Sequence, residues 1–150
     1  THIGGGTLLK ELKQRCIELA IDDRCQWLGS QPQQTVLQHY HQADLFVLNS
    51  QIDENGDRDG LPNVIVEAQS QALAVLSTNI SGIPELIETE VNGILVEQRD
   101  TPALNAALVR LIREPGFRTA LGQAGNHKVR NQFDKDINIQ QLYEQFINLG

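Results

Sequence analysis

One stretch of the chain decides the fold. Residues 45–68 have the sequence LFVLNSQIDENGDRDGLPNVIVEA. The continuous apolar run over 45–48 is typical of a strand that is buried on both faces of a parallel sheet. A polar loop with glycines follows over 49–60, and Pro62 then opens a helix that we expect to end near Ala72. A buried strand that leads through a loop into a helix is the unit from which α/β folds are built.

The same alternation of strands and helices continues on both sides of this stretch. We expect strands at His2-Ile3, 25–28, 45–48, 74–77 and 94–96, and helices at 8–20, 33–42, 62–72, 84–88, 101–113, 115–132 and 137–149. The pattern predicts an α/β fold with a Rossmann-like parallel sheet, flanking helices and a helical C-terminal end. Ligands of such sheets bind outside the carboxyl ends of the strands, which directs attention to the loops after Ile3, Leu28, Leu48 and Ser77.

Composition narrows the class of protein. A chain of 150 residues with 40% hydrophobic and 21% charged residues fits one globular α/β domain. The formal charge of −7 argues against nucleic-acid binding, which depends on Lys and Arg. It also means that a phosphate-bearing ligand must be met by backbone amides, or by basic residues outside this chain. We therefore expect no nucleic-acid partner.

Several features predict where the protein works and how much of it the chain represents. The sequence holds no apolar run of about 20 residues and no signal peptide, so we expect a cytoplasmic protein. Cys16 lies on the apolar stripe of the first helix, and we expect both cysteines to be reduced. Because the chain has no methionine and opens on Thr1-His2-Ile3-Gly4, we expect it to be the end part of a longer polypeptide or a trimmed chain.

The start of the helix at Pro62 has the features of an anion site. The amides of Asn63 and Val64 have no carbonyl of their own helix to bond, and they lie at the positive end of the helix dipole. Glu67 follows on the same helix, where a carboxylate can accept two hydrogen bonds from the vicinal diol of a ribose. Phosphate at the amides and ribose at Glu67 match the layout of a nucleotide. The alternative is that Glu67 is an ordinary solvated helix residue.

Two other motifs are weaker. Asn55, Asp57, Asp59 and Gly60 match the early part of a calcium loop, but the bidentate acid should fall at position 66, where the chain has Val. The turn Gly4-Gly5-Gly6 is rich in glycine, but Leu9 stands where a dinucleotide fingerprint needs its third glycine. That turn can bring backbone close to a ligand, or it can be a plain tight turn.

Five motifs in order resemble a known family, the group 1 glycosyltransferases (family 4, retaining, GT-B fold). They are Ala43-Asp44-Leu45-Phe46-Val47-Leu48-Asn49-Ser50, the stretch 59–68, Ser77-Thr78, Ser81-Gly82-Ile83-Pro84-Glu85-Leu86-Ile87 and Asn92-Gly93-Ile94-Leu95-Val96. The resemblance covers most of the chain and points to the C-terminal, donor-binding domain. It implies one nucleotide-sugar-binding domain over residues 1–150, truncated on its N-terminal side, with the acceptor-binding domain absent from the chain.

The resemblance also implies a role for individual residues. The family pattern is an acid, seven residues and then Glu, which assigns Asp59 and Glu67 as catalytic, with Glu67 as the ribose ligand. Gly60, Leu61, Asn63 and Val64 would contact the sugar and diphosphate through their amides, and Gly29 and Ser30 would line the base. The implied reaction is retaining transfer of a sugar from a nucleotide-diphosphate donor to an acceptor hydroxyl. The resemblance implies no cofactor and no metal, and it allows peripheral membrane contact at the inner membrane face.

The chain departs from the family pattern at three places. Asp59 stands where Glu is usual, and Ala72 and Ala74 stand where Gly and Pro are usual. The Arg and Lys pair that clamps the diphosphate would lie before Thr1, so we expect the chain alone to be inactive and a weak binder. Two alternatives stay open: a sugar-nucleotide epimerase of the same fold, and a non-catalytic nucleotide-sugar-binding module. A flavodoxin-like signalling domain lacks support, because the acidic cluster that it needs is missing.

Overall fold

The computed structural model describes residues 1–52 and 60–133. These fall into two compact units, Thr1–His39 and the part that begins at Tyr40, and each is described by itself. The boundary lies within one helix, α2 (Gln33–Gln42). That residues 1–150 form a single domain stays a prediction.

The first unit contains a short strand pairing whose two partners are separated in the chain by two helical segments. His2 and Trp27 form a parallel bridge, supported by hydrogen bonds from His2 N to Gln26 O at 2.7 Å and from Leu28 N to His2 O at 3.0 Å. Between them lie α1 (Leu9–Glu18) and the 3₁₀ helix η1 (Asp22–Arg24). The expected strand at 25–28 is therefore reduced to a single bridge, while the expected helix at 8–20 is confirmed with slightly shorter bounds.

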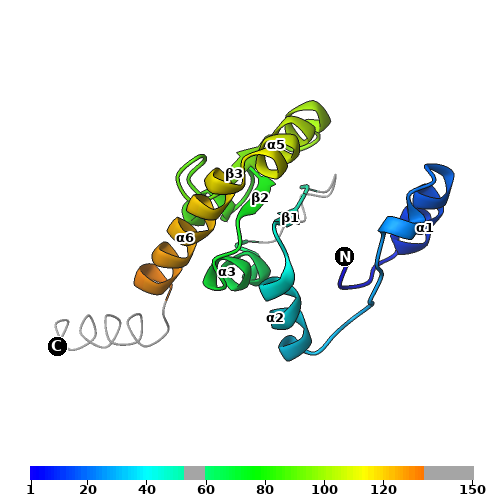
Figure 1. The fold of residues 1–150 in the computed structure, drawn as a ribbon, viewed down its shortest axis with the longest axis horizontal. Coiled ribbons are helices and arrows are strands. Elements are labelled where there is room, and N and C mark those ends of the chain that lie inside the picture. Colours follow the sequence, from blue (N-terminus) through cyan, green and yellow to red (C-terminus); the bar gives the residue numbers. More distant parts are fainter. Residues whose placement is uncertain (53–59, 134–150) are drawn as a thin grey trace. The chain divides into compact units, whose positions relative to one another are not determined.

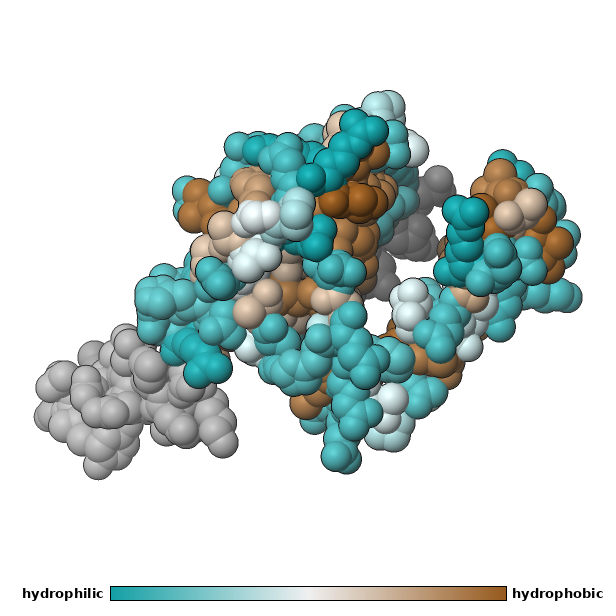
Figure 2. Space-filling view, viewed as in Figure 1, coloured by the Kyte–Doolittle hydropathy of each residue, from teal (hydrophilic) through white to brown (hydrophobic). Residues whose placement is uncertain are grey.

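The apolar stripe that the sequence predicts on α1 does not form a buried core in this unit. Helix α1 buries none of its residues, and Leu8 and Leu12 are 64% and 48% exposed. Figure 2 shows brown, apolar atoms on the surface of this segment. The physical reason is size, because a unit of fewer than about 40 residues rarely has enough chain to cover a hydrophobic face.

The second unit contains a parallel three-stranded sheet in the order β1-β2-β3 (Figure 1). The strands are β1 (Phe46–Leu48), β2 (Val75–Thr78) and β3 (Ile94–Val96). All four residues of β2 are buried, because it is the central strand. The prediction that the first of these strands is buried on both faces is wrong, since Val47 is 41% exposed and β1 ends the sheet that the structure describes.

Four helices accompany this sheet: α3 (Asn63–Ser70), α4 (Ile83–Leu86), α5 (Thr101–Arg113) and α6 (Pro115–Gln132). Figure 1 shows α5 beside β3, with α6 leading from α5 toward α3. The core between sheet and helices is formed by Ala74, Leu76, Ile94, Val96, Leu111 and Leu121. The predicted fold class, a parallel sheet with flanking helices, is confirmed, and the part of the predicted helical end that the structure describes consists of α5 and α6. The expected helix at 137–149 lies outside the described residues.

The junction between α3 and β2 explains one departure from the family pattern. Leu73 N bonds Ala68 O at 3.1 Å and Ala72 N bonds Gln69 O at 2.9 Å, which is the Schellman arrangement that ends a helix. Ala72 takes the left-handed position with φ of 58°. This conformation is strained for alanine and free of strain for glycine. The helix therefore ends at Ser70 rather than near residue 72 as predicted.

We predict that Ala72→Gly stabilises the chain. Relief of the left-handed strain exceeds the entropy that glycine adds to the unfolded state, so the free energy of unfolding should rise by about 0.5–1 kcal/mol. Denaturant unfolding of the two proteins measures the difference. The control is Ala68→Gly, a buried position inside α3, which should lose about 1 kcal/mol or more. Equal losses in both variants would contradict the assignment of strain to Ala72.

The same turn is covered by α6. A Cβ at Gly122 would lie 2.1 Å from Ala72 O, and one at Gly125 would lie 2.9 Å from the Gln69 side chain. Helix α6 can therefore approach α3 closely only because these two positions have no side chain.

We predict that Gly122→Ala is strongly destabilising, by about 2–3 kcal/mol, because the backbone carbonyl that it meets cannot rotate away. Gly116→Ala is the matched control, since it lies in the same helix and a Cβ there meets nothing within 4 Å. Thermal unfolding should separate the two variants clearly. A similar change in both would contradict the contact with Ala72, because helix propensity alone favours alanine over glycine at both positions.

Candidate donor-binding site

The carboxyl ends of β1 and β2 are joined by side-chain hydrogen bonds. Ser77 Oγ donates to Leu48 O at 2.8 Å, and Thr78 Oγ1 donates to Ser50 O at 2.7 Å. Both side chains belong to residues with no exposed surface. Buried hydroxyls need partners, and these partners are the carbonyls at and just beyond the end of β1. The loop that starts at Asn49 is thereby fixed at its root.

The turn that enters α3 is held by a close backbone contact. Gly82 N donates to Gly60 O at 3.1 Å, and a Cβ on Gly82 would lie 3.2 Å from the Gly60 carbonyl group. Any larger residue at 82 would push the turn away. The Ser81-Gly82-Ile83 motif therefore serves to position the start of α3.

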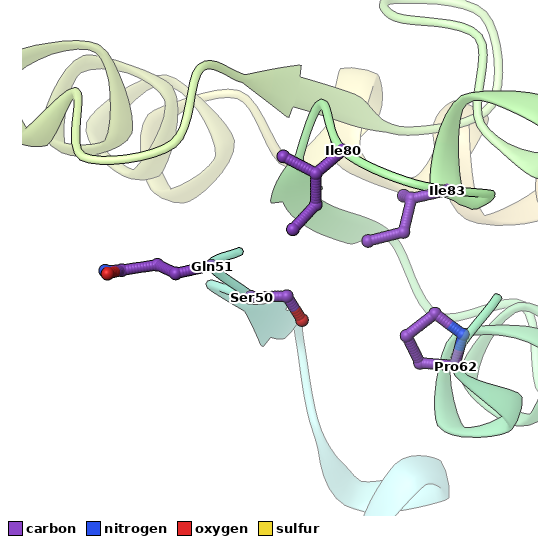
Figure 3. A pocket seen from close by; sticks show the side chains of 5 residues that line it. All are labelled: Ser50, Gln51, Pro62, Ile80 and Ile83. Carbon is purple, nitrogen blue, oxygen red and sulfur yellow. The ribbon is translucent and has the colours of Figure 1, made fainter. Parts of the chain in front are cut away.

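A cavity of about 230 Å³ opens among these segments, lined by Ser50, Gln51, Pro62, Ile80 and Ile83. Figure 3 shows the Ser50 hydroxyl on the side of Pro62, while the Gln51 side chain points away from the other four. The buried hydroxyl of Ser81, next to Ile80, has no hydrogen-bond partner among the described atoms. This volume is below the usual 300–1,000 Å³ of small-molecule sites, so it suits a part of a ligand such as one or two phosphates.

Helix α3 begins beside this cavity. Pro62, at the cap position, makes no side-chain hydrogen bond to the helix, and Ile65 N bonds Pro62 O at 3.0 Å. The amides of Asn63 and Val64 precede the first carbonyl that α3 could offer them, and they lie at the positive end of its dipole. From the sequence we expected Pro62 to be the first helical residue, and the structure places it one position earlier, at the N-cap.

Glu67 lies one turn beyond Asn63 on the same face of α3, because residues four apart are neighbours on a helix. It is half-buried. Tyr40 packs nearby: its ring meets Phe46 edge-on at 5.6 Å between centroids, and its hydroxyl lies 3.4 Å from Val64 O. Burial raises the pKa of Tyr40 to about 12, and the negative charge of Glu67 adds to the shift. The pattern of the sequence did not single out Tyr40.

The remaining site residues predicted from the sequence fall in three parts of the chain. Gly60, Leu61, Asn63 and Val64 share the turn and first helical residues beside the cavity, although the residue of that segment that lines it is Pro62. Gly29 and Ser30 belong to the first unit, where Gly29 has φ of 65° and its carbonyl accepts from Gly4 N at 2.9 Å. Asp59 lies outside the described residues, as do Asn55 and Asp57 of the calcium-loop alternative.

Ser50, Ile80 and Ser81 were not named as site residues from the sequence. The rule that ligands bind at the carboxyl ends of parallel strands was a signal that could have found them, since Ser50 follows β1 and Ile80 and Ser81 follow β2. Among the described residues, no three His, Cys, Asp or Glu side chains are grouped so that they could hold a metal ion. Within the same residues, no helix has the length and apolar character needed to cross a membrane.

Comparison with known proteins identifies the family. Residues 2–128 match the model of the glycosyl transferases group 1, and the chain belongs to that family. It is 35% identical over 144 residues to the amylovoran biosynthesis glycosyltransferase AmsK of Erwinia amylovora, covering 96% of this chain and 35% of AmsK.

A second relative is a GDP-mannose-dependent alpha-(1-6)-phosphatidylinositol monomannoside mannosyltransferase of Mycolicibacterium smegmatis. It is 27% identical, over 83% of this chain and 33% of that protein. Among solved structures, Anabaena Alr3699/HepE in complex with UDP superposes with a TM-score of 0.81 at 23% identity, covering 93% of this chain and 36% of that one. The chain thus spans about a third of the length of these relatives, and the structural match confirms the GT-B type of fold.

We predict that Tyr40 makes stability fall in alkali. Its folded pKa of about 12 lies above the ordinary value near 10, so the folded state holds the phenol proton more tightly. The resulting stability is fully present below about pH 10 and is lost as pH rises through about 12. Relative to Tyr40→Phe, which cannot ionise, the chain should lose about 2–3 kcal/mol across this window. Thermal unfolding of both proteins across that range measures it; parallel curves would contradict the burial of the Tyr40 hydroxyl.

Proposed function

We propose that the chain binds the nucleoside diphosphate part of a sugar donor at the N-terminus of α3. The proposal rests on the start of this helix, which receives no side-chain cap from Pro62 and lies beside the 230 Å³ cavity at the carboxyl end of a parallel sheet. The amides of Asn63 and Val64 are donors, as phosphate oxygens require, and so is the Ser81 hydroxyl, which has no hydrogen-bond partner among the described atoms. Membership of the glycosyltransferase family supports the same ligand class.

In this arrangement Glu67 holds the ribose. Its carboxylate, one helical turn beyond the phosphate-binding amides, accepts hydrogen bonds from the two vicinal hydroxyls. A ribose and its 5′-phosphates are spaced along a nucleotide in the same order. The Tyr40 hydroxyl contacts Val64 O of α3, and its raised pKa keeps the phenol neutral near the Glu67 carboxylate. Gly29 and Ser30 remain our proposal for the contact with the base, and Asp59 for a contact near the transferred sugar.

For the whole enzyme we propose retaining transfer of the sugar to an acceptor hydroxyl. The bond from the anomeric carbon to the diphosphate breaks, and the acceptor oxygen bonds to the same face of that carbon while its proton leaves with the diphosphate. Negative charge develops on the leaving diphosphate, and amides fixed at a helix N-terminus stabilise it without reorganising. We propose that no metal ion takes part. The proposed acceptor is a glycan, a lipid-linked sugar or a small molecule. The names of the relatives, an amylovoran biosynthesis glycosyltransferase and a phosphatidylinositol monomannoside mannosyltransferase, support the first two.

The expected affinity is low. The amides of Asn63 and Val64 alone, at about 1.5–3 kcal/mol for each charge-assisted hydrogen bond, give a Kd between roughly 0.04 and 6 mM. The net charge of −7 works against any tighter binding of a diphosphate.

Calorimetric titration with UDP, GDP and ADP tests the proposal. We expect saturable binding of one of the three, weakened about tenfold in Glu67→Gln. Glu85→Gln is the matched control, because it removes one negative charge from an exposed position of the same unit. Inorganic pyrophosphate, which has no ribose, should bind the wild type and Glu67→Gln equally.

Each outcome has a distinct meaning. Equal weakening in Glu67→Gln and Glu85→Gln would show that Glu67 has no specific role. Weaker pyrophosphate binding in Glu67→Gln would assign the residue to the helix rather than to ribose. Absence of saturation with all three nucleotides at concentrations well above the expected Kd would refute donor binding by this chain.

A further inference from the structure

The two cysteines of the chain are neighbours in space. Cys16 lies on α1 and Cys25 follows η1, and their sulfur atoms are 3.6 Å apart, with the Cys25 thiol donating to the Cys16 sulfur. Both are free thiols and both are partly exposed. They are the two cysteines in the sequence of 150 residues, so the encounter involves every thiol that the chain has.

The backbone between them fixes this encounter. Helix α1 ends in a Schellman turn, with Ala20 at φ of 53° and Ile21 N bonded to Cys16 O at 3.0 Å. The chain then forms η1, and Cys25 N bonds Asp22 O at 3.1 Å. These bonds reverse the chain within the eight residues between the cysteines. The pair therefore depends on main-chain structure as well as on side-chain rotamers.

We propose that Cys16 and Cys25 form a reversible dithiol site that small-molecule disulfides oxidise to an intramolecular disulfide. The sulfur atoms must approach by about 1.5 Å to reach the length of an S–S bond. A side-chain rotation of two partly exposed residues on a short turn can supply such a shift. Nothing in the family assignment or in the proposed donor site uses this pair.

The reaction balances with glutathione disulfide as the oxidant. One protein thiolate attacks the oxidant, forms a mixed disulfide and releases one glutathione thiol. The second protein sulfur then attacks the protein sulfur of that mixed disulfide and releases the second glutathione thiol. Two protein thiols and one small disulfide thus become one protein disulfide and two small thiols, and a reducing thiol reverses both steps.

The surroundings distinguish the two sulfurs. Partial burial raises the pKa of the Cys16 thiol, and the adjacent Cys25 thiol and the charge of Asp22 raise it further. Burial thus disfavours the Cys16 thiolate, and the thiolate is the nucleophile in disulfide exchange. The 3.6 Å separation lets either sulfur close the ring once the other has formed the mixed disulfide.

Trp27 provides a built-in reporter of the event. It is the one tryptophan of the chain, two residues after Cys25, and its ring lies tilted against that of His2, with 5.2 Å between ring centroids. Its emission therefore reports on the unit that contains the cysteines. A disulfide formed this close should quench that emission, and reduction should restore it.

The test is oxidation of the 150-residue chain with glutathione disulfide, followed by intact mass and thiol titration. The expected product has lost two hydrogens, has no reactive thiol, stays monomeric and regains both thiols on reduction. Cys25→Ser and Cys16→Ser should each stop at a stable mixed disulfide with one glutathione, because neither retains a second sulfur to close the ring. Circular dichroism before and after oxidation checks that the fold is kept.

Other products would overturn the proposal. Two stable glutathione adducts on the wild type, disulfide-linked dimers, or two thiols that persist under the same oxidant would each show that the sulfurs do not close a ring. Should a serine variant fail to fold, a trivalent phenylarsenical supplies the second measurement on the wild type. One arsenical per chain, with both thiols protected, is expected from a dithiol site; no protection would contradict it.

Discussion

The burial of β2 is the constraint on which the rest of the second unit depends. Every residue from Val75 to Thr78 is buried, and the last two of them carry hydroxyls. Those hydroxyls cannot stay unpaired in a dry interior, so they bond Leu48 O and Ser50 O and fix the end of β1. The strand thus contributes to the core, and its hydroxyls fix the end of β1 at the carboxyl edge of the sheet, where the candidate site lies.

The same strand dictates how α3 is placed. Its residue Val75 follows the left-handed turn at Ala72, and that turn accepts α6 only because Gly122 has no side chain. At the other end of α3, Gly82 holds Gly60 through a short backbone contact. The helix is therefore fixed at both ends by glycines and a strained alanine. The position of its first turn beside the cavity is a consequence of this packing.

Much of this could be predicted from the sequence because the signals were local. The apolar runs at 45–48, 74–77 and 94–96 and the Thr101-Pro102 start predicted strands and a helix whose bounds agree with the structure to within about two residues. The first unit was predicted less well. The apolar stripe of α1 indicated a buried face. The spacing of apolar residues shows that their side chains share one face of a helix, but it does not show whether another element covers that face.

The site was predictable where it rests on one helix and not where it depends on several segments. Helix geometry alone predicts that Pro62 lies at the start of the helix, and that Asn63 and Glu67 lie one turn apart on the same face. The cavity wall at Ile80 and the role of Tyr40 depend on contacts between residues more than 20 positions apart, which a single sequence does not display.

The central claim is that the first amides of α3 receive the diphosphate. Amide-resolved NMR of the isotope-labelled chain during titration with a nucleoside diphosphate tests it most directly. We predict the largest chemical-shift changes at the amides of Asn63 and Val64, with smaller changes at Ser81 and Gly82. Saturable shifts that leave Asn63 and Val64 unchanged would contradict it, because the ligand would then bind at another surface of the chain.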